Sequence, residues 1–95
     1  MRLLTATILA FVAVTASAET TERGLAACLT KEWAQDVDKF AVAGDRASWD
    51  AYINASKCAL LPKGTQVTVT DWSWDGYVEF AVQGVKLWAI GDAIK

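Results

Sequence analysis

The fold is decided by the stretch QVTVTDWSWDGYVEFAVQ, residues 66–83. Apolar side chains recur at every second position near both of its ends, which is the pattern of half-buried β-strands. Asp75 and Gly76 lie between the two runs and are typical of a two-residue hairpin turn, whose central positions need positive φ. The stretch therefore predicts an antiparallel β-hairpin.

A two-residue turn also predicts the register of this hairpin, because cross-strand partners keep a constant sum of residue numbers. The expected pairs are Trp74 with Tyr77, Trp72 with Glu79, Thr70 with Ala81, and Val69 with Val82. The face expected to form the core carries Val67, Val69, Val78, Phe80 and Val82. The other face carries Thr70 and the four candidate binding residues, Trp72, Trp74, Tyr77 and Glu79.

The aromatic face has two interpretations. Three amphipathic rings on one face would form a stacking platform for a peptide, a glycan strand or a partner protein. Alternatively, helices from elsewhere in the chain lie over the rings and bury them as a second core. The exposure of Trp72 and Trp74 distinguishes these interpretations.

The segment upstream of the hairpin, residues 30–56, predicts two helices joined by a tight turn. Thr30 is suited to cap the first helix, and the apolar positions that follow recur at helical spacing. Gly44 ends that helix and Asp45 caps the second. Downstream of the hairpin, residues 85–90 predict a third strand and Gly91 begins a short terminal turn. We expect an α+β fold in which an N-terminal helical hairpin, residues 30–56, precedes a small antiparallel sheet or partial barrel, residues 61–94.

The first eighteen residues predict a signal peptide. Arg2 precedes an apolar stretch, and Ala16-Ser17-Ala18 has the small-x-small pattern cut by signal peptidase. Cleavage between Ala18 and Glu19 would leave residues 19–95 as a single mature domain. The expected location is periplasmic or secreted.

The chain contains two cysteines, Cys28 and Cys58, and an oxidising compartment favours a disulfide between them. An antiparallel helix pair between them would return the chain to its starting point. A redox or zinc site is the alternative, but the spacing is not C-x-x-C and the chain has no histidine. We therefore expect one structural disulfide, no metal and no cofactor.

The charge and hydropathy of the sequence argue against nucleic acid as a partner and against a membrane-spanning segment after the signal. The predicted mature chain has eight cationic and eleven acidic side chains, a net charge of −3, and no basic stripe of the kind that binds nucleic acid. No apolar run after the signal approaches the roughly 20 residues that span a bilayer. Leu25–Cys28 (LAAC) resembles a lipoprotein cleavage box, but charged residues separate it from the signal. We expect a monomer.

The sequence does not predict an enzyme. Without histidine a catalytic base has to be a carboxylate or a lysine, and Ser48, Ser56 and Ser73 have no imidazole to activate them. Asp36 and Asp38 point about 200° apart on an ideal helix and cannot act together on one substrate.

Residues 61–93 resemble bacterial SH3-like domains of exported proteins. The matching pieces are LPKGTQVTV at 61–69, GYVEF at 76–80, GVKLW at 84–88, and Ala93. The whole chain is similar to small exported bacterial proteins in which a helical hairpin precedes such a β unit. The resemblance implies an SH3-like unit over residues 61–94, a structural role for Trp88, and a non-catalytic module that binds peptides or cell-wall components.

Two functions are consistent with these features. The first is an exported binding module that recognises a peptide, a cell-wall component or a partner protein through the aromatic face. The second is an inhibitor or immunity-type protein that blocks an exported enzyme, steered by its acidic hairpin.

Overall fold

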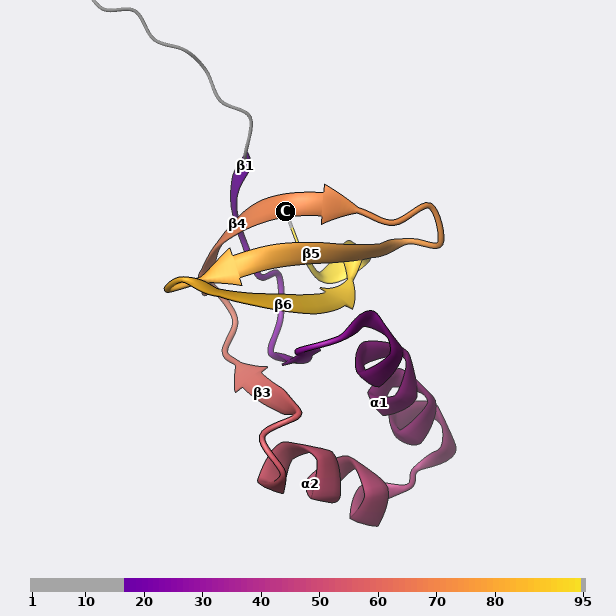
Figure 1. The fold of residues 1–95 in the computed structure, drawn as a ribbon. Coiled ribbons are helices and arrows are strands. Elements are labelled where there is room, and N and C mark those ends of the chain that lie inside the picture. The colour runs from indigo at the N-terminus through magenta and orange to yellow at the C-terminus, as the bar shows by residue number, and fades with distance from the viewer. Residues whose placement is uncertain (1–16, 95) are drawn as a thin grey trace, which may run out of the picture.

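The computed structural model describes residues 17–94, which form one six-stranded antiparallel sheet and two α-helices (Figure 1). The elements are β1 Ser17–Thr20, β2 Leu25–Cys28, α1 Lys31–Ala43, α2 Arg46–Asn54, β3 Cys58–Leu61, β4 Gln66–Trp72, β5 Tyr77–Val82, β6 Val85–Ile90 and the 3₁₀ helix η1 Gly91–Ala93. The predicted cleavage point between Ala18 and Glu19 lies inside β1. The rest of the predicted signal peptide, residues 1–16, lies outside the described residues.

The predicted order, an N-terminal helical hairpin followed by a small SH3-like sheet or partial barrel, is wrong. Two strands, β1 and β2, precede the helices and join a sheet of six strands, so the helices form an insertion between β2 and β3. The sequence concealed β2 because Leu25–Cys28 has no alternation of apolar and polar residues. Its strand conformation comes from pairing over its whole length with β3, from Leu25 opposite Leu61 to Cys28 opposite Cys58.

One short connection joins two strands that are far apart in the sheet order. The strand order is β1-β4-β5-β6-β2-β3, so three strands lie between β1 and β2. Residues 21–24 join these strands. Thr21 holds the connection: it is buried, forms a bridge with Ile94, and its hydroxyl donates to the Pro62 carbonyl at 2.8 Å.

The molecule has two hydrophobic cores, one on each face of the sheet. The inner core consists of Ala27, Leu61, Val67, Val69, Val78, Phe80, Leu87, Ala89 and Ile94, with Leu25 and Val82 packed against it. This confirms the core predicted from the hairpin pattern. The second core lies between the helices and the opposite face, around Cys28, Ala34, Val37 and Cys58. Tyr77 and Trp88 contribute to it from β5 and β6.

The predicted helix caps are confirmed. The Thr30 hydroxyl accepts a hydrogen bond from the Trp33 amide at 3.1 Å, and Gly44 ends α1 with a φ of 71°. Asp45 caps α2 by accepting from the Ser48 amide at 3.1 Å. Lys57 then returns the chain to the sheet with its ammonium 4.9 Å from the Trp33 ring centre, which ties the end of the insertion to its first helix.

The expected disulfide between Cys28 and Cys58 is confirmed. The two residues are directly opposite each other on β2 and β3, and both are buried. The bond therefore crosses the base of the helical insertion and joins its two ends to the sheet.

Candidate binding surface at the β4–β5 hairpin

The turn between β4 and β5 is longer than the sequence predicts. Four residues, 73–76, connect the strands: the Ser73 amide donates to the Tyr77 carbonyl at 2.7 Å and the Gly76 amide to the Ser73 carbonyl at 3.1 Å. Gly76 has a φ of 92°, whereas Asp75 is not among the residues with positive φ. The predicted two-residue turn is therefore wrong, and Trp74 lies in the loop rather than opposite Tyr77.

A bulge near Thr70 changes the register further. Val69 lies opposite Phe80 and Asp71 opposite Glu79, so β4 has one residue more than β5 between these pairs. Trp72 consequently lies opposite Val78, not opposite Glu79 as predicted.

The four candidate binding residues therefore do not share one face. Directly opposed residues point to the same side of an antiparallel pair, so Trp72 shares the inner face with buried Val78. Tyr77 and Glu79 lie on the other face, where the helices pack. The predicted three-ring platform does not form, because the bulge places Trp72 and Tyr77 on opposite faces.

Trp72 and Trp74 are nevertheless the most exposed aromatic residues in the described chain. Trp74 is 96% exposed in the loop, and Trp72 is 56% exposed at the end of β4. Trp72 lies against Gly91 of η1, where an added Cβ would be only 2.8 Å from the indole. We define the hairpin end as residues 71–77. It presents the exposed indole of Trp74 and the indole of Trp72, which packs against Gly91.

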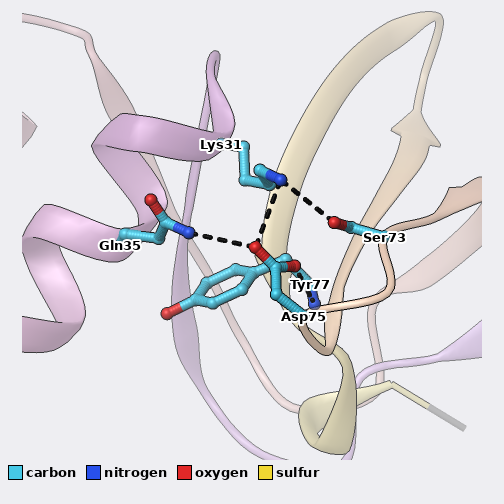
Figure 2. A network of polar contacts seen from close by, with 5 residues as sticks. All are labelled: Lys31, Gln35, Ser73, Asp75 and Tyr77. Atoms are coloured by element: carbon cyan, nitrogen blue, oxygen red, sulfur yellow. Dashed lines mark hydrogen bonds and ion pairs between the residues drawn. The ribbon is translucent and has the colours of Figure 1, made fainter.

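A polar network fixes the hairpin end to α1 (Figure 2). Lys31 lies 3.1 Å from the Asp75 carboxylate and donates to the Ser73 hydroxyl at 3.0 Å. The Gln35 amide nitrogen donates to the same Asp75 oxygen at 3.2 Å, and the Tyr77 amide donates to the other oxygen at 3.3 Å. The Lys31 and Asp75 side chains are 28% and 25% exposed, so this ion pair is partly shielded from water.

The other side of the loop is bound to η1. The Gly91 amide donates to the Gly76 carbonyl at 2.7 Å. The loop that carries Trp74 is thus held by α1 on one side and η1 on the other. These contacts hold the backbone of the loop that presents the indole.

Asp75 is ionised at neutral pH in this setting. Its hydrogen bond with the Ser73 hydroxyl holds the pKa of Asp75 below its ordinary value, with further contributions from Lys31 and the Tyr77 amide. The Asp75 carboxylate, which Lys31 and Gln35 of α1 bind, is therefore negatively charged over the physiological pH range.

Both tyrosines of the chain donate to aspartates of α1. The Tyr77 hydroxyl donates to Asp38 at 2.6 Å, and the Tyr52 hydroxyl donates to Asp36 at 2.8 Å. Burial, followed by the bond to Asp38, raises the pKa of Tyr77, and the bond to Asp36 raises the pKa of Tyr52. The two aspartates thus accept hydrogen bonds from two different tyrosines.

These bonds predict an alkaline transition. A tyrosine whose folded pKa exceeds the unfolded value of about 10 contributes stability that is complete below that pH and is lost as pH rises above it. We expect the tyrosinate absorbance to appear in one cooperative step that coincides with loss of circular dichroism. Tyr77→Phe leaves only Tyr52 to titrate. Ionisation of a tyrosine near pH 10 with the fold intact would contradict the hydrogen bonds.

The contact between Lys31 and Ser73 resembles a serine nucleophile beside a lysine base, but its geometry opposes that role. A base needs a free lone pair to accept the serine proton. Lys31 instead donates to Ser73 while it is ion-paired with Asp75. Within residues 17–94, no three histidine, cysteine or acidic side chains are grouped to hold a metal ion. The network holds the loop against α1.

Sequence reasoning missed Lys31, Gln35, Asp38 and Gly91. Lys31, Gln35 and Asp38 follow the i, i+4, i+7 spacing of one helix face, so their common direction could have been found. Their partners on the hairpin could not, because that pairing depends on how the insertion folds back on the sheet.

Comparisons with protein-family models, curated proteins and solved structures found no match to this chain. The resemblance of residues 61–93 to SH3-like domains therefore stays a prediction. Among the described helices, neither α1 nor α2 has the length and hydropathy needed to cross a membrane.

Proposed function

We propose that the protein is a non-catalytic binding module that acts in the periplasm or outside the cell, and that its contact surface is the hairpin end. The observation that carries this proposal is the 96% exposure of Trp74 on a loop held from both sides. The disulfide and the predicted signal peptide support the location.

The position of Trp74 matches what a binding anchor requires. Tryptophan is enriched among the residues that dominate binding energy, because its large ring fills a pocket on the partner. A loop already fixed in its bound conformation loses little entropy on association. Lys31 and Gln35 supply that fixation from α1, so the binding role also accounts for the polar network.

We favour a protein partner. A single protruding indole inserts into a pocket of a folded surface, whereas the predicted platform for a glycan strand needed three rings on one face, and the bulge separates Trp72 from Tyr77. The same geometry supports a second candidate, an inhibitor that inserts the loop into the cleft of an exported enzyme. A one-to-one complex that abolishes the activity of the captured protein would identify this form.

Affinity capture tests the proposal. The immobilised protein, its Trp74→Ala variant and its Leu60→Ala variant are exposed to the exported proteins of the source cells. Leu60 is the matched control because it is a 55% exposed apolar residue on β3, away from the hairpin end. We expect one partner to be retained by the parent protein and Leu60→Ala but not by Trp74→Ala. Equal retention by all three would contradict the proposal.

A further inference from the structure

The β4–β5 region carries an unbalanced negative charge. Residues 64–85 contain three acids and no lysine or arginine. Lys31 neutralises Asp75. Asp71 and Glu79 have no ion-pair partner among residues 17–94, where the ion pairs are Arg23–Asp92, Lys31–Asp75 and Arg46–Asp50.

The bulge places Asp71 and Glu79 directly opposite each other on adjacent strands. Like charges in this position are destabilising. Their hydrogen bonds come from neutral donors: the Thr70 hydroxyl donates to Glu79 at 2.9 Å and the Trp72 amide donates to Asp71 at 2.9 Å. The repulsion is therefore softened within the chain but not neutralised. A cation from outside would remove it.

The carboxylate of Asp71 lies at the end of β4, where it accepts a hydrogen bond from the Trp72 amide. The Ser73 amide points to β5, so by strand alternation the Trp72 amide points to the open edge of β4. Asp71 caps that amide, which places its carboxylate at the same edge. Within residues 17–94, β1 pairs with β4 no further than Val69, and both Asp71 and Trp72 are exposed. A guanidinium or ammonium group bound there meets the Asp71 carboxylate at the strand end that also carries Trp72.

From this charge complementarity we propose that the hairpin end docks a cationic segment of its protein partner. An arginine or lysine of that segment pairs with Asp71 and Glu79, next to the contact made by the indoles of Trp72 and Trp74. The inference rests on the proposed function and adds the chemistry of the partner. It also assigns the acidic steering role to Asp71 and Glu79, since Asp75 is occupied by Lys31.

The test uses three blocked six-residue peptides, alternating glycine with arginine, glutamate or glutamine. Binding is followed through the indole N–H resonances of the disulfide-bonded protein, with Trp72 and Trp74 assigned by their phenylalanine variants. We expect only the arginine peptide to shift both resonances. Its affinity falls at least about fivefold between roughly 20 mM and 300 mM salt, because exposed charges are screened.

Matched variants test whether Asp71 and Glu79 are the acids that bind the arginine peptide. Asp71→Asn combined with Glu79→Gln lowers the affinity for the arginine peptide about tenfold, whereas Asp50→Asn, at a half-exposed acid on α2, leaves it unchanged. Equal shifts with all three peptides, no shift with any of them, or an unchanged affinity in the double variant would overturn the inference.

The two proposals fail separately. If capture of the partner needs Trp74 but does not change with salt or with the double variant, the cationic partner is wrong and the Trp74 anchor stands. If the arginine peptide binds at Asp71 and Glu79 but capture does not depend on Trp74, the cation site stands and the proposed function is wrong.

Discussion

Replacing both Cys28 and Cys58 with alanine is expected to lower the free energy of unfolding by roughly 3.6 kcal/mol, the loop-closure value for a bridge across 30 positions. We expect no new contact in the folded state to offset this loss of stability, because both residues are buried and pair directly across β2 and β3. The total free energy of unfolding of a small domain is about 5–15 kcal/mol, so the disulfide contributes a large share of it.

Urea unfolding of the parent protein and the double variant under oxidising conditions measures this difference. The matched control is the parent protein unfolded in the presence of a reductant, which breaks the disulfide. It should unfold at a urea concentration close to that of the double variant. A loss of less than about 1 kcal/mol, the typical effect of an ordinary substitution, would show that the bond does not restrain the helical insertion.

Gly91→Ala is expected to destabilise the protein by about 1–3 kcal/mol, the usual cost of overpacking. The added Cβ would lie 2.8 Å from the Gly76 carbonyl oxygen, 2.8 Å from the Trp72 ring and 3.2 Å from Val78. Because Gly91 also donates to Gly76, the substitution strains the contact that holds the hairpin end against η1.

Gly24→Ala is the control for this prediction. The nearest atom to its added Cβ is the Leu61 carbonyl oxygen at 3.7 Å, an ordinary contact, and Gly24 is not among the glycines with positive φ. We expect its stability to stay within about 1 kcal/mol of the parent protein. Equal effects of the two substitutions in thermal or urea unfolding would contradict the close packing of Trp72 on Gly91.

Much of the fold could be predicted because its signals are local. The strands around residues 66–83 alternate clearly, and both helices begin at residues whose side chains cap them. The disulfide followed from the predicted oxidising compartment and from the presence of only two cysteines. The strands β1 and β2 were missed because they are short and have little alternation, so only their pairing with β4 and β3 makes them strands.

The candidate site was predicted in its residues but not in its arrangement. Trp72 and Trp74 were identified from composition and from their place in the hairpin. The extra residue at Thr70 and the four-residue loop then altered which side chains share a face. A bulge has no local signal in this sequence, since Val67 to Thr70 continue a regular alternation. The helix that supports the loop comes from a distant segment.

The central claim is that Trp74 on its fixed loop anchors a partner protein. The most direct test is the dissociation constant of the captured partner, measured for the parent protein, Trp74→Ala and Leu60→Ala after circular dichroism has confirmed that all three are folded. We expect Trp74→Ala to raise the constant by about 30-fold or more, as loss of a binding hot spot does, with Leu60→Ala unchanged. Constants for Trp74→Ala and the parent protein that agree within about twofold would contradict the claim.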